Sequence, residues 1–151
     1  GSVPILVAAL GPVMLKLAGR LADGTITWMT GPKTLESHVI PLIRAAAQEA
    51  GRPEPRIAAG LPIVITRDAA SAREAIMKSL AIYGTLPSYR AMLDKEGVGG
   101  PGDVAIVGDE AEVGAQIDRL RDLGVTEFGG AIIPVEEGAA ERTFEFLASR
   151  S

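Results

Sequence analysis

Cysteine is absent from this 151-residue chain, and histidine occurs only once, as His38. Without cysteine the chain has no disulfide, no thiolate metal site and no cysteine nucleophile. A single histidine excludes a multi-histidine metal site within one chain, so we predict no metal centre. No apolar run approaches the length of a membrane span. The start, Gly1-Ser2, is typical of a cleaved tag rather than of a signal peptide. These absences predict a cytoplasmic protein without a membrane segment.

A strong excess of charge is also lacking. Fifteen lysines and arginines stand against nineteen aspartates and glutamates, a net charge of −4, and the basic residues are scattered. A nucleic-acid-binding domain would carry a clustered basic surface, so we expect no nucleic-acid partner. With 47% hydrophobic and 23% charged residues the composition is that of a globular protein. The length suits one domain with its own core.

The stretch VPILVAALGPVML at residues 3–15 organises the interpretation of the rest. An apolar run ends at Leu10, and an amphipathic pattern starts at Val13, which predicts a buried parallel strand turning directly into a helix. The apolar stripe expected to face the core in this helix consists of Met14, Leu15, Leu17, Ala18 and Leu21. Pro12 suits the first helical position because its missing N–H would have no intrahelical partner. Gly11 lets a ligand or another backbone come close. The turn is either a simple connection or an anion site, since free N–H groups begin the helix there.

Hydrophobic patterns and breaks predict the remaining elements. Pro41 lies inside a helical pattern and predicts a kink or a break at Ile40. Pro62 predicts a bulge or an unpaired position in its strand. The run Gly97–Gly102 lacks the Lys and Ser/Thr of a nucleotide loop and is interpreted as a flexible loop. The expected elements are helix 13–22, strand 25–29, helix 33–50, strand 56–66, helices 69–83, 88–96 and 109–123, strand 125–134 and a closing helix after residue 138.

Strands that alternate with helices predict an α/β fold with a parallel sheet and right-handed crossovers. Four strands can form a small doubly wound sheet or half of an eight-stranded barrel. A spacing of about 35 residues per βα unit favours the barrel, which has about 250 residues in its typical form. We therefore predict one (βα)4 half-barrel unit over residues 1–151.

Four passages together resemble a known family. They are PILVAALGPVMLKLAGRLADGTITWM, RIAAGLPIVITRDAASAR, LPSYRAMLDKEG and VGDEAEVGAQIDRLRDLGVTEFGGAI. In this order they resemble the luciferase-like monooxygenase superfamily, and within it the deazaflavin (coenzyme F420)-dependent oxidoreductases. The resemblance implies a TIM-type (βα)8 barrel of about twice this length, of which the chain matches only the C-terminal half, strands five to eight.

The resemblance also implies site residues. A side chain with a hydroxyl or carboxyl group is frequent at the cofactor turn of flavin-nucleotide relatives, whereas this turn offers only backbone N–H groups. We therefore expect coenzyme F420, with FMN as the alternative. The implied cofactor-binding residues are Ala9, Leu10, Gly11, Pro12, Val13 and Met14. The implied substrate-pocket residues are Trp28, Met29, Thr30, Tyr83, Tyr89 and Arg90.

Simpler interpretations stand beside these assignments. Trp28 could pack under the following helix, and Tyr89 and Arg90 could be surface helix residues. His38 is expected on a solvated helix face, because strand ends carry the chemistry of barrels. Asp109 and Glu112 fit a capping box. Glu136 and Glu137 form a charged loop or supply a proton, and no catalytic residue is assigned: the resemblance places most proton donors in the absent first half.

The expected function is hydride transfer between a reduced coenzyme and a small organic substrate, by a parent enzyme of which this chain is an inactive half. The alternatives are a stable, non-catalytic half-barrel that self-associates and a small-ligand-binding α/β domain. An open half-barrel exposes apolar edges. The expected partner is therefore the missing N-terminal half-barrel or a second copy, as a homodimer or higher oligomer.

Overall fold

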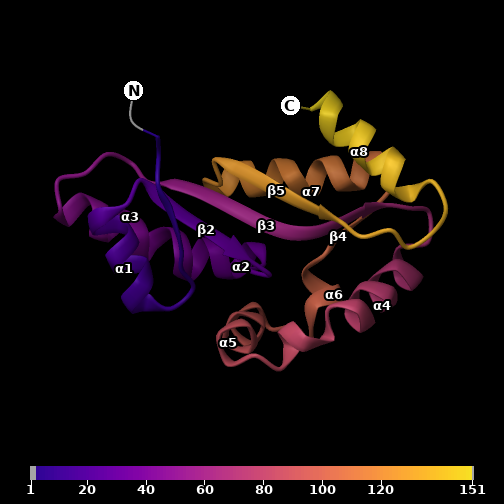
Figure 1. The fold of residues 1–151 in the computed structure, drawn as a ribbon, viewed down its shortest axis with the longest axis horizontal. Coiled ribbons are helices and arrows are strands. Elements are labelled where there is room, and N and C mark those ends of the chain that lie inside the picture. The colour runs from indigo at the N-terminus through magenta and orange to yellow at the C-terminus, as the bar shows by residue number, and fades with distance from the viewer. Residues whose placement is uncertain (1–2, 151) are drawn as a thin grey trace.

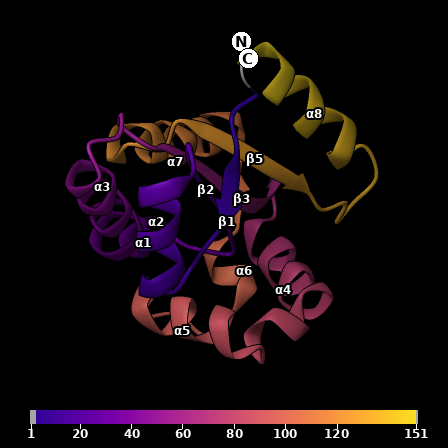
Figure 2. The same ribbon diagram turned by 60° about the vertical axis from the view of Figure 1, so that its left-hand side comes forward.

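The computed structural model describes residues 3–150 and shows one parallel sheet flanked by helices (Figure 1, Figure 2). The strands are β1 (Leu6–Ala8), β2 (Gly24–Trp28), β3 (Arg56–Ile65), β4 (Ile106–Gly108) and β5 (Glu127–Ile132). The helices are α1 (Pro12–Leu21), α2 (Pro32–Thr34), the π-helix η1 (Leu35–Val39), α3 (Ile40–Glu49), α4 (Ala69–Ser79), the 3₁₀-helix η2 (Ala81–Gly84), α5 (Pro87–Glu96), α6 (Pro101–Val104), α7 (Glu110–Leu123) and α8 (Ala139–Ser149). Within residues 3–150 no helix has the length and apolar character needed to cross a membrane.

The long strand β3 is the centre of the sheet. β2 pairs with its first half and β5 with its other edge, and β1 pairs with β2, all in parallel. β4 pairs with the end of β3, where Ile63 aligns with both Ile106 and Ile132. The predicted parallel α/β fold is confirmed. The structure adds β4 to the four predicted strands, because three residues are too few to show a periodicity.

Pro62 forms no bulge, but it is unpaired on one edge of β3, which is the second of the two predicted alternatives. It aligns with Ala131 of β5 in an unbroken register. Gly60 accepts a hydrogen bond from the N–H of Met29, so even-numbered residues of β3 direct their backbone polar groups toward the β2 edge. On that edge β2 has ended at the level of Gly60, and β4 begins only at Ile63. The missing N–H of proline therefore removes no ladder hydrogen bond.

The main core lies between one face of the sheet and helices α1, α3 and α7. Odd-numbered residues of β3 point into it, since side chains alternate across a strand. Its buried members include Ile57, Ala59, Leu61, Ile63 and Ile65 of β3, Leu15 and Ala18 of α1, Ile43 of α3 and Val113 and Leu120 of α7. A smaller core joins Val64 to α4, β4 and α8. The other face of the sheet, near β1 and β2, is left open.

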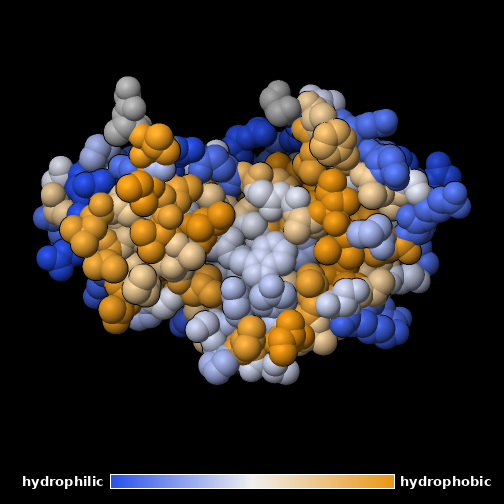
Figure 3. Space-filling view, in the orientation of Figure 1, coloured by the Kyte–Doolittle hydropathy of each residue, from blue (hydrophilic) through white to orange (hydrophobic). Residues whose placement is uncertain are grey.

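Helix α1 differs from its predicted orientation. Leu15 and Ala18 are buried as expected, but Leu17 and Leu21 of the same predicted stripe are 44% and 72% exposed. Other exposed apolar side chains belong to the segment before β1, to α1 and to β2, and Figure 3 shows apolar surface gathered over α1. We call this set the open edge; it consists of Val3, Ile5, Val13, Leu17, Leu21 and Ile26. A helix at the end of a half-barrel lacks the neighbour that would cover its second side.

The break at Pro41 is confirmed. The helical segment changes from the π-helix η1 to the α-helix α3 at Ile40, whose N–H donates to the carbonyl of Leu35, five residues back. The predicted capping box of Asp109 and Glu112 is also present at the start of α7. At the start of α4 the Asp68 carboxylate accepts a hydrogen bond from the N–H of Ser71. Hydrogen bonds from the backbone and side chain of Ser71 lower the pKa of Asp68.

Candidate functional site

A cavity of about 650 Å³ opens at the carboxyl ends of β1 and β2, on the face of the sheet opposite the main core. Parallel α/β proteins bind ligands at this end of their strands. The lining residues are Ala8, Ala9, Leu10, Gly11 and Met14 from β1 and α1, Ile26, Thr27 and Trp28 from β2, Gly60 and Gly129 from β3 and β5, and Ser88 and Tyr89 from α5. The cavity thus brings the predicted cofactor turn and part of the predicted substrate pocket together.

Three glycines, Gly11, Gly60 and Gly129, belong to the lining of this cavity. A Cβ at Gly60 would come within 3.1 Å of the Trp28 ring, so the indole lies directly against the backbone of β3. At Gly11 a Cβ would meet nothing within 4 Å, which leaves open space beside the turn. Gly60 and Gly129 lie opposite each other in the register of β3 and β5. Neither glycine was among the predicted site residues, although a glycine inside a strand signals that a ligand or another backbone approaches closely.

An aromatic chain links the cavity wall to the helices after α4. The Trp28 and Tyr83 rings meet edge to face, with centroids 5.9 Å apart, and Tyr83 meets Tyr89 at 5.0 Å. The Nε1 atom of Trp28 is buried, and it has no hydrogen-bond partner among the described residues. Trp28 and Tyr89 line the cavity, whereas Tyr83 supports them from behind. Trp28 therefore both packs and forms the wall.

Four of the predicted site residues lie outside the cavity lining: Pro12, Val13, Met29 and Thr30. Met29 and Thr30 are fully buried, and the backbone of Met29 has a φ of 59°, in the left-handed region. A non-glycine residue in this region is strained, and the surrounding structure must hold it. The N–H of Met29 donates to the carbonyl of Gly60 and anchors the end of β2. These two residues support the wall from beneath.

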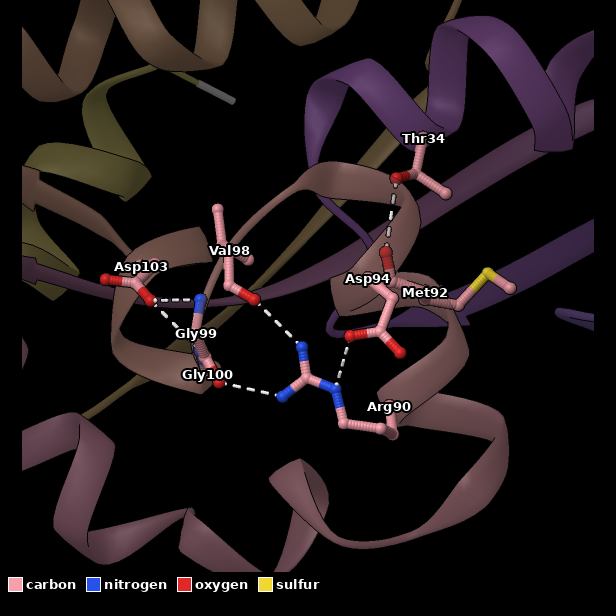
Figure 4. Close-up of polar contacts among 8 residues, drawn as sticks. All are labelled: Thr34, Arg90, Met92, Asp94, Val98, Gly99, Gly100 and Asp103. Carbon is pink, nitrogen blue, oxygen red and sulfur yellow. Dashed lines mark hydrogen bonds and ion pairs between the residues drawn. The ribbon is translucent and has the colours of Figure 1, made fainter.

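Arg90 does not line the cavity, and its side chain bonds to its own helix and to the loop that follows (Figure 4). Its guanidinium donates to Asp94 on its own helix and to the carbonyl oxygens of Val98 and Gly99. Because all of these contacts are internal, the structure does not place Arg90 at a substrate entrance.

The run 97–102, predicted as a flexible loop, is held in place from both sides. Besides the bonds from Arg90, the N–H groups of Gly99 and Gly100 donate to the Asp103 carboxylate, and Pro101 begins helix α6 (Figure 4). Asp103 thus accepts the hydrogen bonds of the backbone N–H groups in the turn that precedes α6.

The turn from β1 to α1 has few local restraints. Gly11 is the residue before the helix, and it has no side chain that could cap the first N–H groups. The first turn of the helix also carries no acidic residue. His38 reaches this turn from η1: its Nε2 atom lies 2.9 Å from the carbonyl oxygen of Leu10. The prediction of a solvated histidine is therefore wrong, because the π-helix and the turn of β1 meet only in the tertiary structure.

Two further carboxylates occupy defined positions. Glu96 is buried and accepts hydrogen bonds from the N–H groups of Lys33 and Thr34 and from the Thr34 hydroxyl. Glu136 accepts from the Thr66 hydroxyl and from Arg142. Neither lines the cavity. The role of Glu96 had no local signal, because its partners lie about sixty residues away along the chain.

A second hollow of about 500 Å³ lies between α7, β5 and α8. Its residues include Thr126 and Glu127 at the start of β5, so it sits near the amino end of that strand. Ligand sites of parallel barrels form at the opposite, carboxyl end. The cavity at Trp28 is therefore the candidate ligand site.

Parallel strands joined by helices, with a cavity where the strands end, define a βα half-barrel. Residues 1–127 match the family model described as luciferase-like monooxygenase. The chain belongs to this family.

Named relatives are about twice as long. The chain is 31% identical to the 5,10-methylenetetrahydromethanopterin reductase of Methanopyrus kandleri, over 92% of this chain and 48% of the relative. It is 32% identical to the Methanolobus tindarius reductase of the same name, over 92% and 52%. A solved structure of the coenzyme F420-dependent tetrahydromethanopterin reductase from Methanopyrus kandleri superposes with a TM-score of 0.75 at 26% identity, covering 96% of this chain and 49% of that one. The chain thus spans about half the length of the curated relatives it matches.

An F420-dependent secondary alcohol dehydrogenase, solved with an F420–acetone adduct, shares the fold. Its TM-score is 0.69 at 24% identity, over 87% of this chain and 44% of that chain. These coverages agree with the half-barrel that the strand pattern predicts.

Proposed function

We propose that this chain is the carboxyl-terminal half of an F420-dependent oxidoreductase that transfers hydride between the reduced coenzyme and a small organic substrate. The observation that carries the proposal is the position of the cavity. It joins the Leu10–Gly11 turn to Trp28 at the carboxyl ends of the strands. The named relatives that cover this region, reductases and a dehydrogenase, include F420-dependent enzymes.

The residues present fit a planar deazaflavin with a phosphate group. Gly11 and Gly129 leave an open lining, and Trp28, whose ring lies against Gly60, supplies an aromatic wall. The start of α1 has no acidic side chain that would repel a phosphate. Its free backbone N–H groups favour an anion. We assign the cofactor site to Ala9, Leu10, Gly11 and Met14, with Pro12 and Val13 shaping the helix start.

When bound, reduced F420 supplies the hydride, so the protein has to orient the substrate and exclude water. In this chain Trp28 and Tyr89 form an apolar wall that does so. Tyr89 is the one lining residue with an ionisable side chain, among the residues that the structure describes. Any other proton donor must therefore come from the half of the barrel that this chain lacks.

The direct test is to titrate the chain with reduced and oxidised F420 and to follow Trp28, its single tryptophan. Bound deazaflavin is expected to quench the indole fluorescence saturably, and FMN to do so more weakly. The titration is repeated with the amino-terminal half of the Methanopyrus kandleri relative added. Absence of quenching by F420 under both conditions would refute the proposed function.

Gly11→Ala tests the cofactor turn. The new methyl group meets no atom within 4 Å, and the φ of −79° at this residue is ordinary, so the free energy of unfolding is expected to change by less than about 0.5 kcal/mol. The same methyl group occupies the space beside the turn, and F420 affinity is expected to fall about tenfold. Equal affinities of wild type and variant, measured by the Trp28 titration, would move the cofactor away from this turn.

We further propose that the open edge is completed by the missing first half of the barrel. In its absence a second copy of the chain takes its place. Six apolar side chains of this edge are exposed, from 44% at Leu17 to 83% at Val3. Contiguous apolar surface and an unpaired strand edge both favour association. The small-ligand-binding domain without a partner is disfavoured by the same exposure.

Leu21→Glu tests this association. Leu21 is 72% exposed, so the fold tolerates the change, but a charge on the open edge opposes burial. Sedimentation velocity over a concentration series is expected to show an associating wild type and a variant weakened at least about tenfold. Ile82→Glu, at a similarly exposed apolar residue of η2, is the matched control and leaves association unchanged. A wild type that stays monomeric at high concentration would contradict self-association.

A further inference from the structure

His38 is bound to the turn on which the proposed cofactor site depends. Its Nε2 atom lies 2.9 Å from the Leu10 carbonyl oxygen, and the ring is partly buried. A carbonyl oxygen can only accept, so Nε2 carries the proton and donates it. This contact therefore requires that His38 carries a proton on Nε2.

The π-helix η1 sets the direction of this side chain. The N–H of Ile40 donates to the Leu35 carbonyl, which widens the turn by one residue immediately before Pro41. One residue corresponds to about 100° of rotation around a helix of 3.6 residues per turn. A regular α-helix would therefore turn His38 to another side of the segment. Such π-turns occur frequently at functional sites.

The hydrogen bond orients the peptide group between Leu10 and Gly11. No peptide bond among residues 3–150 is cis, so the N–H of Gly11 points opposite to the carbonyl that His38 holds. Gly11 is the N-cap of α1 and, without a side chain, makes no cap hydrogen bond that would fix the turn. The space beside it is empty of neighbours within 4 Å of a built Cβ. His38 thus restrains a peptide group that is otherwise loosely held.

We propose that His38 is a positioning residue of the cofactor turn. By holding the Leu10 carbonyl, it directs the Gly11 N–H away from η1 and toward the phosphate group of the bound coenzyme. The inference rests on the proposed function for the identity of the ligand. The restraint on the turn itself is a property of the free chain.

The first experiment measures that restraint without ligand, by ¹⁵N NMR. Because the chain has one histidine, every imidazole ¹⁵N signal in the spectrum belongs to His38. The expected spectrum shows the Nε2–H tautomer. His38→Phe removes the donor and is expected to shift the Gly11 amide signal and to speed its hydrogen exchange. His38→Gln restores a donor at a similar reach and is expected to return both toward the wild-type values.

The second experiment separates positioning from general stability. F420 and the same deazaflavin without its phosphodiester are titrated into wild type, His38→Phe and His38→Gln, with Trp28 fluorescence as the readout. His38→Phe is expected to lose about tenfold in F420 affinity and nothing for the phosphate-free ring. His38→Gln regains most of the loss. A merely structural histidine would affect both ligands alike.

Three outcomes overturn the inference. They are an Nδ1–H tautomer in the free chain, a Gly11 amide unchanged in His38→Phe, and equal losses for the two deazaflavins. Failure of wild type to bind either deazaflavin refutes the proposed function and the direction toward phosphate. The NMR measurements then still decide whether His38 restrains the turn.

Discussion

The variant Gly24→Ala is expected to lose about 3 kcal/mol or more of its free energy of unfolding, because two strands approach too closely there for any side chain. Gly24 is the first residue of β2, paired with Leu6 on one side and Arg56 on the other. A Cβ would fall 2.0 Å from the carbonyl oxygen of Arg56, and its other nearest atoms are also Arg56 backbone. Backbone cannot rotate aside as a side chain can, so β2 and β3 must separate.

Urea unfolding, followed by Trp28 fluorescence and far-UV circular dichroism at one protein concentration, measures this loss. Gly129→Ala is the matched control in the same sheet. Its new Cβ would have no neighbour nearer than 3.9 Å, so its stability is expected to stay level or to rise slightly. If Gly24→Ala unfolds at the wild-type urea concentration, the register of β2 on β3 is wrong.

The second large effect is expected at Glu96, the buried carboxylate that ties α5 to the start of α2. Its Oε2 accepts from the Thr34 N–H at 2.7 Å and the Thr34 hydroxyl at 2.8 Å, and its Oε1 accepts from the Lys33 N–H at 3.1 Å. These backbone donors belong to a helix start whose preceding residue, Gly31, has no side chain to cap them. Glu96 fills the place of that cap; a Cβ at Gly31 would collide with its carboxyl group.

Glu96→Ala leaves the N–H groups of Lys33 and Thr34 without this acceptor, while the Thr34 hydroxyl keeps the Met92 carbonyl, and a loss of about 2–4 kcal/mol is expected. Glu96→Gln keeps one acceptor oxygen and is expected to lose less. Thermal unfolding by circular dichroism measures both. Because α5 also carries Tyr89 of the cavity wall, the Trp28 emission of Glu96→Ala should change below its unfolding temperature.

Asp94→Ala is the matched control on the same helix. Asp94 is exposed and pairs with Arg90 at the surface, so its removal is expected to cost about 0.5 kcal/mol or less. Equal losses of unfolding free energy in Asp94→Ala and Glu96→Ala would show that Glu96 contributes no more than a surface ion pair and does not cap α2.

Much of the fold follows from local patterns. The alternation of strands and helices predicts the parallel sheet, since crossover connections join parallel strands. The break at Pro41 and the cap at Asp109 depend on groups within a few residues. The turn at Gly11 was identifiable because an apolar strand ends there and a helix begins at Pro12. Such features need no distant partner, so the sequence predicts them.

Other features depend on residues that are distant along the chain. Pro62 fits a regular ladder only because β2 ends and β4 begins on either side of it. Arg90 bonds to a glycine-rich loop instead of a substrate, and Leu17 and Leu21 of a predicted buried stripe are exposed. Periodicity measures which residues share a face, but it does not record whether a neighbour covers that face.

The sequence by itself therefore determined the class of fold, the half-barrel length and the turn at which the site is proposed. The tertiary structure alone decided which side chains serve that turn. His38 reaches Leu10 across 28 positions, and Glu96 reaches Thr34 across 62. Both act by satisfying backbone groups at the ends of elements, and those groups accept a partner from anywhere in the chain. Local sequence carries no record of such a partner, because only the packing of helices on the sheet brings the two together.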